Sequence, residues 1–249
     1  MMEFPTSLIP AVAATFFAAG VVKGVTGMGL PTMAMGILGT LVSPLAAASL
    51  LIVPSFITNV WQLSAGPALR PLLRRLWPMM TAIVLGTLLG SSWLAEAGAG
   101  TASSALGGAL IAYSAYTLLA HQLHVPRHAE PWLSPLVGAL TGLVAGATGV
   151  FVLPAVPYLQ ALALEKDDLV QALGLSFTIS TLALALSLGL RGAFPLDHLA
   201  PSALAVVPAL AGMWVGQVLR RVLSPRVFRR GFLVCLMALG IELLLKLHL

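Results

Sequence analysis

A glycine-rich segment occurs twice in the chain, and each copy lies in an apolar stretch that is too long for one straight membrane helix. The first copy, at residues 20–31, reads GVVKGVTGMGLP, and the second, at residues 142–154, reads GLVAGATGVFVLP. Glycine in a helix interior weakens the helix, and proline removes a backbone hydrogen bond. The repeated segment therefore predicts a matched break in two otherwise helical stretches.

The composition places the chain in a membrane. Hydrophobic residues make up 59% of its 249 residues, charged residues make up 8%, and the mean hydropathy is +0.99. A soluble domain carries about 25% charged residues, so this chain could not cover a water-facing surface. The apolar runs are continuous and rich in Ala, Leu and Gly, which predicts an all-α polytopic membrane protein.

We distinguish eight apolar segments along the chain. Six of them are 21 to 24 residues long, which is enough to span about 30 Å of hydrocarbon. The first and fifth segments have 35 and 31 residues and contain the repeated glycine-rich copies. Each of these two is expected to fold at its centre into a broken or re-entrant helical hairpin. The eight segments are 8–42, 45–65, 72–95, 101–121, 133–163, 169–190, 199–219 and 227–248.

The arginine-rich loops favour two halves of opposite orientation. If each long segment crossed the membrane once, the loop with Arg70, Arg74 and Arg75 would lie opposite the loop that contains Arg220 and Arg221. Basic loops concentrate on the cytoplasmic side, and hairpins would put both loops there. The prediction is therefore two inverted-topology repeats, each with one hairpin and three full transmembrane helices. Residues 1–122 form the first repeat, 123–132 a cytoplasmic linker and 133–249 the second, and both termini are expected in the periplasm.

Lys23 is the only basic residue deep inside an apolar segment. A charge at the bilayer centre costs about 2.5–3.5 kcal/mol on insertion scales, so it usually has a functional reason. One interpretation is a countercharge for an anionic substrate, and the other is a lysine that snorkels to the interface. The equivalent position in the second copy is Ala145, so any such charge belongs to the first half alone.

The candidate binding residues lie at the two hairpin tips and on the helices that follow them. A break in a membrane helix frees backbone N–H groups, which favour an anion, and glycine lets a ligand approach the backbone. Uncharged polar side chains would complete such a site, although Ser and Thr also bond between helices. The predicted substrate-binding residues are Lys23, Gly24, Thr26, Gly27, Gly29, Asn59, Gln62, Gly146, Thr148, Gly149, Gln171, Ser176 and Thr178.

Several function classes find no support in the sequence. The chain contains no GxSxG, HExxH or P-loop motif, so we expect neither an enzyme nor an ATP site. The single cysteine, Cys235, excludes an intramolecular disulfide and a Cys-rich metal site, and no cofactor is expected. The net charge of +5 comes from arginines in short loops, where basic residues set membrane orientation, so we expect no nucleic-acid partner.

The stretches GVVKGVTGMGLPTMAMGILG and VPYLQAL, the latter followed by an acidic turn and ALGLSFTIS, resemble the TauE/SafE family, also called toluene-sulfonate uptake permeases. The resemblance covers nearly the whole chain. It implies a bacterial inner-membrane protein that moves sulfite, sulfoacetate or organosulfonates, and it maps the family motif onto Lys23, Gly24, Thr26, Gly27 and Gly29, then Gly146, Thr148 and Gly149. Leu30 and Phe151 stand where many members have glycine.

The resulting expectation is a secondary transporter of a sulfur oxyanion, most readily an organosulfonate, that binds its substrate at the two tips near the midplane. Transport would follow alternating access of the inverted halves, and a proton or a sodium ion is the candidate coupling ion. The expected partners are the lipid bilayer and a second copy of the chain in a homodimer. Two other classes stay open, namely an anion channel and a membrane subunit or scaffold without transport of its own.

Overall fold

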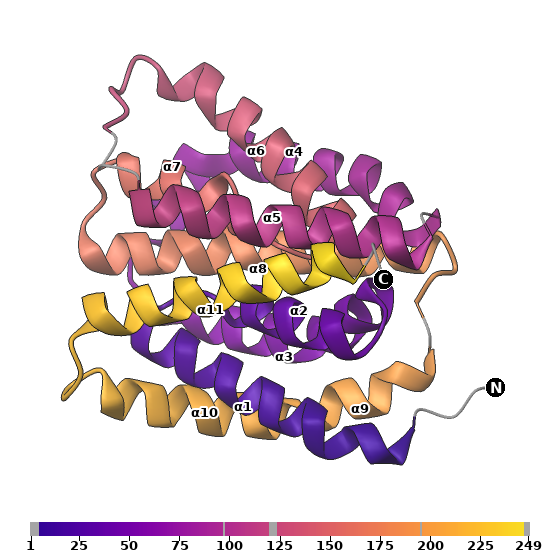
Figure 1. Ribbon diagram of the computed structural model, residues 1–249. Helices are drawn as coiled ribbons and strands as arrows, with labels where there is room; N and C mark the ends of the chain where they lie inside the picture. The colour runs from indigo at the N-terminus through magenta and orange to yellow at the C-terminus, as the bar shows by residue number, and fades with distance from the viewer. Residues whose placement is uncertain (1–4, 97, 120–123, 195, 247–249) are drawn as a thin grey trace.

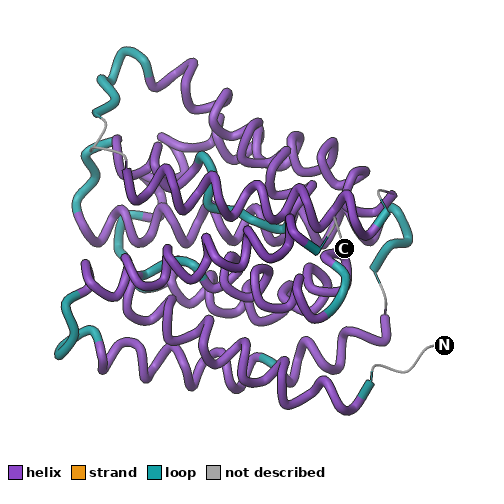
Figure 2. Tube along the Cα trace, in the orientation of Figure 1, coloured by secondary structure: helices purple, strands orange, loops and turns teal. Residues whose placement is uncertain are grey.

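The computed structural model describes residues 5–96, 98–119, 124–194 and 196–246, and within them the regular structure is helical (Figures 1 and 2). Most of the helices lie side by side with their axes roughly along one direction, so that their ends gather at two opposite ends of the molecule. The α-helices are α1 (Ile9–Thr26), α2 (Leu30–Leu41), α3 (Pro44–Ser64), α4 (Leu69–Glu96), α5 (Ala99–Leu119), α6 (Glu130–Thr148), α7 (Ala155–Ala161), α8 (Lys166–Leu190), α9 (Leu199–Leu204), α10 (Val206–Leu219) and α11 (Pro225–Leu245). Two 3₁₀ turns, Thr6–Leu8 and Leu196–His198, precede α1 and α9.

The helices confirm an all-α protein with several candidate membrane spans. Six stretches in the described residues are long and apolar enough to cross a bilayer: α1, α3, α4, α5, α8 and the combined range Leu199–Leu219. Large apolar side chains are exposed on the outside, such as Leu89 at 70% and Val207 at 71%, as expected for a lipid-facing surface. Most helices begin or end within about three residues of the predicted apolar segments, in line with the usual uncertainty of helix ends.

The first and fifth apolar segments are both broken at the repeated glycine. Gly27 ends α1 in a left-handed conformation with φ 77° and ψ 1°, and Gly149 ends α6 with φ 70° and ψ 9°. Left-handed backbone at the residue after a helix is the usual glycine ending, because glycine has no Cβ to clash. After the first break the chain continues at once into α2, whereas residues 150–154 separate the second break from the shorter α7.

The segment 199–219, predicted as one helix, is divided at Ala205 into α9 and α10. Pro208 accounts for the division, because a proline ring clashes with the carbonyl group four residues earlier, here that of Leu204. Pro54 creates a similar defect in α3, where the carbonyl oxygen of Leu50 accepts a hydrogen bond from Ser202 Oγ at 2.8 Å. A side chain from α9 therefore satisfies a group that the helix itself leaves unpaired.

Glycine contacts bring the broken helix of each half against a helix of the other half. A Cβ atom added at Gly20 would lie 2.2 Å from the carbonyl oxygen of Ala209, and one at Gly24 would lie 2.3 Å from that of Met213. The two helices α1 and α10 therefore run in the same direction with their backbones in contact. In the same way, Gly142 lies against Ile83 and Gly146 against Thr87, so α6 runs parallel to α4.

The remaining large contacts join α3 to α8 and α5 to α11. Asn59 of α3 contacts Thr181 of α8, whereas Gln62 contacts Val170, so these two helices are antiparallel. Gly107 and Gly240 lie against each other at the crossing of α5 and α11. Four of these pairs, α1 with α10, α4 with α6, α3 with α8 and α5 with α11, thus join a helix before residue 120 to one after residue 124. In this scheme α1 with α10 corresponds to α6 with α4, whereas α2 packs mainly on α1 and α3.

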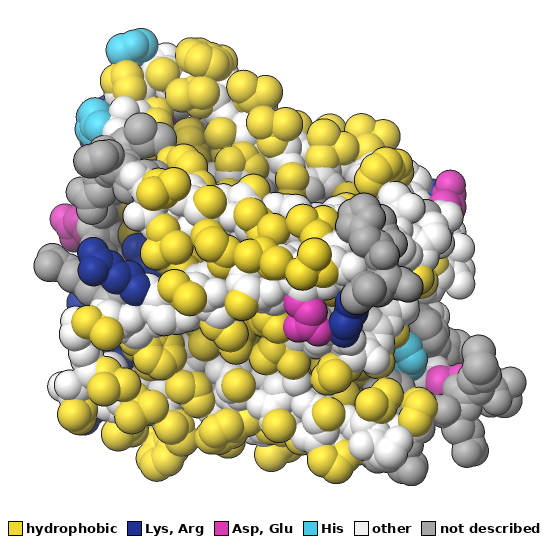
Figure 3. Space-filling view, in the orientation of Figure 1, with side chains coloured by type: hydrophobic (Ala, Val, Ile, Leu, Met, Phe, Trp, Pro, Cys, Tyr) yellow, Lys and Arg dark blue, Asp and Glu magenta, His cyan; other side chains and the backbone are white. Residues whose placement is uncertain are grey.

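Most basic residues lie at one end of the helices, which we call the basic end. It is formed by the starts of α4, α6, α8 and α11 and the ends of α3, α5 and α10. Figure 3 shows lysine and arginine side chains grouped at one edge of a largely apolar face. The other end holds Arg191, which pairs with Glu96, and Lys246, which pairs with Glu242. The residues of the basic end are Arg70, Arg74, Arg75, Arg127, Lys166, Arg220, Arg221, Arg226, Arg229 and Arg230.

Candidate functional site

Lys23 is buried near the end of α1, with 3% of its surface exposed. Its ammonium group donates a hydrogen bond to Thr58 Oγ1 at 3.2 Å and another, shorter one to Asn59 Oδ1. Both partners lie on α3, whose last turns run beside the last turns of α1. The side chain therefore points into the protein, which disagrees with the interpretation of a lysine that snorkels to the interface.

The partners of Lys23 are held by a buried polar network between α3 and α8. Asn59 Nδ2 donates to Ser55 Oγ at 3.1 Å and to Thr181 Oγ1 at 3.4 Å. Since the amide nitrogen faces these hydroxyls, the amide oxygen must face Lys23. Thr58 donates its own proton to Pro54 O at 2.8 Å, which leaves its oxygen lone pairs for the ammonium group.

Lys23 has no acidic partner inside the described part of the protein. The ion pairs formed there are Arg75–Glu130, Arg191–Glu96 and Lys246–Glu242, and none includes Lys23. An ammonium group has three N–H donors, and Thr58 and Asn59 accept two of them. A buried ammonium group is normally paired with an opposite charge, and no carboxylate of the described residues supplies one here.

A small cavity with a volume of about 130 Å³ adjoins Lys23. Gly24 and Gly27 of the first hairpin line it together with Trp61 and Gln62 of α3. The other lining residues are Ala65, Val170, Met213, Gln217 and Arg220. Helices α1, α3, α8 and α10 thus converge on one space that carries two basic groups, Lys23 and Arg220, and no acidic residue.

A larger and more open cavity of about 500 Å³ lies next to this one at the basic end, and we call it the vestibule. The two cavities share Val170, Gln217 and Arg220 as lining residues. The vestibule adds Lys166, Asp167 and Arg221, so its charged lining is mostly positive. Basic residues gathered around neighbouring cavities raise the local concentration of anions.

The two glutamines predicted for the site have different surroundings. Gln62 lines the cavity, and its Nε2 donates to Gly27 O and Val170 O, both at 2.9 Å, so it ties the hairpin tip to α8. Gln171 instead holds the connection between α3 and α4. Its Nε2 donates to Leu63 O at 2.8 Å and to Gly66 O at 2.6 Å, while its Oε1 accepts from Ala68 N at 2.8 Å.

The threonines of the two tips have the same local role. Thr26 Oγ1 bonds Val22 O at 2.8 Å and accepts from Met28 N at 3.3 Å. Thr148 Oγ1 bonds Val144 O at 2.6 Å and accepts from Val150 N at 3.2 Å. One N–H that each break frees is therefore satisfied by a threonine hydroxyl rather than directed at the cavity.

The other predicted residues lie away from the lining of the Lys23 cavity. Gly29 begins α2 with φ 94° and faces Phe232, and Gly149 faces Met35 of α2. Gly146 is pressed against the backbone of α4. On α8, Thr178 bonds Gly174 O at 2.7 Å, whereas the buried hydroxyl of Ser176 finds no hydrogen-bond partner within the described residues. The cavity therefore joins residues of the first tip to α10, and nothing from the second tip lines it.

Gln217 and Arg220 are the site residues that sequence reasoning missed. In the sequence Arg220 indicates only the orientation of the chain, and Gln217 stands out by no pattern of its own. A usable signal existed, because Gly212 and Gly216 form a small-residue pair that matches Gly20 and Gly24 in spacing. In the structure Gly24 packs against Gly216. Lys23 comes directly before this contact on α1, and Gln217 comes directly after it on α10.

The described residues contain no group of three or more His, Cys, Asp or Glu side chains that could hold a metal ion. Cys235 is exposed on α11. The acid–base groups nearest the cavity are basic and line the path to Lys23. The arrangement is therefore suited to binding an anion rather than to making or breaking covalent bonds.

The model of one protein family, described as sulfite exporter TauE/SafE, matches residues 12–243 of the chain. The chain belongs to the TauE/SafE family. This match confirms the resemblance noted in the sequence, and it makes the protein a multi-pass membrane transporter for sulfite or a related sulfur anion, not an enzyme. No curated protein sequence and no solved structure matches the chain.

Proposed function

We propose that the chain is a secondary transporter that binds a small sulfur oxyanion in the cavity beside Lys23. The observation that carries the proposal is the buried ammonium group with two neutral partners and one donor left over. Sulfite and sulfonate groups present several oxygen acceptors, and a hydrogen bond between charged groups is about twice as strong as one between neutral groups. Arg220 would provide a second, more flexible contact from the vestibule side.

The size of the cavity favours the small members of the substrate class. Its volume of about 130 Å³ is small beside the roughly 500 Å³ of the vestibule. Sulfite or the head of a short-chain sulfonate fits this space, whereas an aromatic tail would have to extend into the vestibule. We therefore place sulfite and short sulfonates ahead of aromatic sulfonates as substrates.

We further propose that the basic end faces the cytoplasm, in the inner membrane of a bacterium, with both termini in the periplasm. The support is the concentration of lysine and arginine at this end, together with ion-paired basic residues at the other. In this orientation the vestibule leads from the cytoplasm to Lys23. The state described here would then be the one that accepts or releases the anion on the cytoplasmic side.

Alternating access is the mechanism that we infer for the two halves. The reciprocal packing scheme and the opposite directions of α3 and α8 support two inverted repeats. Rocking of α1 and α10 against α3 and α8 would close the vestibule and open the other side. The hairpin tips would then connect the helices within each half, and only the first half would supply a positive charge, that of Lys23.

Reconstituted protein tests this proposal. Proteoliposomes loaded with unlabelled sulfite should accumulate radiolabelled sulfite transiently, because a carrier exchanges internal for external substrate. An anion channel would equilibrate the label without this overshoot, and a non-transporting subunit would take up no more than empty liposomes. Either of these two results would contradict the proposal, and addition of a proton or sodium gradient would identify the coupling ion.

A further inference from the structure

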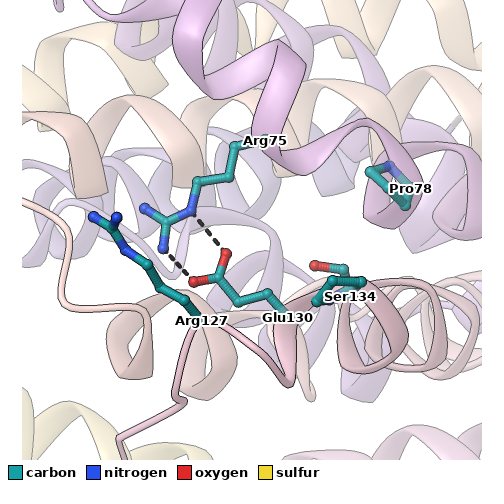
Figure 4. Close-up of a pocket in the computed structure, with 6 residues that line it drawn as sticks. Arg75, Pro78, Arg127, Glu130 and Ser134 are labelled. Atoms are coloured by element: carbon teal, nitrogen blue, oxygen red, sulfur yellow. Dashed lines mark hydrogen bonds and ion pairs between the residues drawn. The ribbon is translucent and has the colours of Figure 1, made fainter.

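A second cavity with charged lining lies between α4 and α6 at the basic end. Its volume is about 520 Å³, and Arg75, Pro78, Arg127, Glu130, Pro131 and Ser134 line it (Figure 4). It shares no lining residue with the Lys23 cavity or with the vestibule. Any ligand held there would therefore be separate from the transported anion.

The lining of this cavity has more positive than negative charge. Arg75 and Glu130 form a two-pronged ion pair, from Nε to Oε2 at 2.8 Å and from Nη2 to Oε1 at 2.6 Å. Figure 4 shows the guanidinium group of Arg127 beside that of Arg75, on the same side of the pair. Among the described residues only Arg75 pairs with the carboxylate of Glu130, so the positive charge of Arg127 is available for an anion.

The donors of the cavity are arranged for an acceptor with several oxygens. Arg75 Nη1 forms no hydrogen bond with another described residue, and Arg127 is exposed and makes no ion pair there. Ser134 Oγ is engaged with the hydroxyl of Tyr158 at 2.6 Å and adds a polar wall. Guanidinium groups bind phosphate through paired N–H groups, which a lone ammonium group does not offer.

The surroundings of the cavity are those of a lipid headgroup layer. Trp77 and Trp132, which neighbour two of its proline residues in sequence, are 61% and 60% exposed. Tryptophan in membrane proteins collects at headgroup depth. Further along α6, away from the basic end, Leu136 and Leu140 are also exposed. A polar, positively charged cavity therefore opens beside an apolar surface that acyl chains would cover.

We propose that this cavity binds the phosphate headgroup of an anionic phospholipid, with the acyl chains along the outer surface of α4 and α6. Arg127 and the free donors of Arg75 bind the phosphate oxygens, as basic pockets at membrane interfaces do. An anionic lipid is preferred to a zwitterionic one because a choline group would bring a cation towards two guanidinium groups. Since α4 and α6 come from different halves of the chain, the bound lipid bridges the two halves.

Lipid titration of the purified protein tests the proposal. The protein in a neutral detergent is titrated with phosphatidylglycerol, phosphatidylcholine, inorganic phosphate and glycerol 1-phosphate, and bound ligand is measured by native mass spectrometry. Phosphatidylglycerol should bind about tenfold more tightly than phosphatidylcholine, and the two soluble phosphates should not displace it at equal concentration. Equal binding of the two lipids would overturn the proposal. Displacement by the soluble phosphates would also overturn it, in favour of a site for free phosphate.

A matched pair of arginine variants locates the binding. Arg127→Gln should weaken phosphatidylglycerol binding by about fivefold, because it removes the unpaired guanidinium group. Arg70→Gln makes the same change of charge on α4 at the same end but outside the cavity, and it should change binding by less than about twofold. Equal losses in the two variants would show general attraction to the basic end and would contradict the proposed site.

Discussion

The side-chain nitrogen of Lys23 on α1 lies 3.2 Å from the hydroxyl oxygen of Thr58 on α3. Its other partner, the amide oxygen of Asn59, is also uncharged. Both hydrogen-bond partners of this buried amine are therefore neutral, and a small cavity with basic lining residues adjoins it. An anion that enters this cavity would gain an ion pair that the protein itself does not supply.

Asn59→Asp replaces the neutral partner of Lys23 with a carboxylate of the same shape. We expect the variant to melt at a higher temperature than the parent, because the buried ammonium group acquires an ion pair. We also expect sulfite affinity to fall by at least about tenfold, because the charge is already neutralised. Thermal melting with and without sulfite measures both effects, since a ligand raises the melting temperature only if it binds. A sulfite-induced shift equal to that of the parent would contradict the account.

Arg220→Gln removes the basic group that the cavity and the vestibule share. Because this charge attracts and guides the anion, the initial rate of sulfite uptake should fall and should depend less on ionic strength. Arg230→Gln is the matched control, since Arg230 lies at the same end but lines a different cavity. If the two variants lose uptake equally, the vestibule is not the path to the site.

The variants Gln171→Leu and Gln62→Leu test whether each buried amide only stabilises the protein or also contributes to sulfite binding. Each substitution leaves backbone carbonyl groups without hydrogen-bond donors. Each buried unpaired group destabilises the folded protein by about 1–3 kcal/mol, so both variants should have a lower melting temperature. Only Gln62→Leu should also weaken sulfite binding, because only Gln62 lines the cavity. Melting curves and binding titrations of both proteins test this difference, and a loss of affinity in Gln171→Leu would place its amide in the site after all.

Gly216→Ala tests the contact between α1 and α10. A Cβ atom at this position would lie 2.3 Å from the carbonyl oxygen of Val21, so the helices must separate and the variant should melt earlier than the parent. Gly108 lies within α5 with no atom inside 4 Å of an added Cβ. Gly108→Ala should therefore be neutral or stabilising by about 0.5–1 kcal/mol, since alanine favours the helix. Equal melting of the two variants would show that the close contact contributes nothing.

The breaks at Gly27 and Gly149 could be predicted from the sequence because a local cause produces them. Glycine allows the left-handed ending of the helix, and the threonine one residue earlier caps the freed N–H in both copies. The overall length of the apolar segments similarly predicts where most helices begin and end. Both signals lie within a few residues of the element that they specify.

The composition of the site depends on contacts that the sequence does not state. Gln217 and Arg220 reach the cavity because α10 packs on α1, and this pairing joins residues that are far apart in the chain. The same cause places Gly146 against α4 and Gln171 against the connection between α3 and α4, outside the lining of the Lys23 cavity. Lys23 could be identified because a charge in an apolar helix is costly wherever the helix packs.

The central claim is that the charge of Lys23 binds the anion. Isothermal titration of purified protein with sulfite, under argon to prevent oxidation, measures this affinity directly in the parent, in Lys23→Met and in the control Lys246→Gln, whose ammonium group is exposed at the opposite end. The account predicts saturable binding to the parent and the control, and a loss of at least about tenfold in affinity for Lys23→Met. Undiminished sulfite binding by a folded Lys23→Met protein would contradict it.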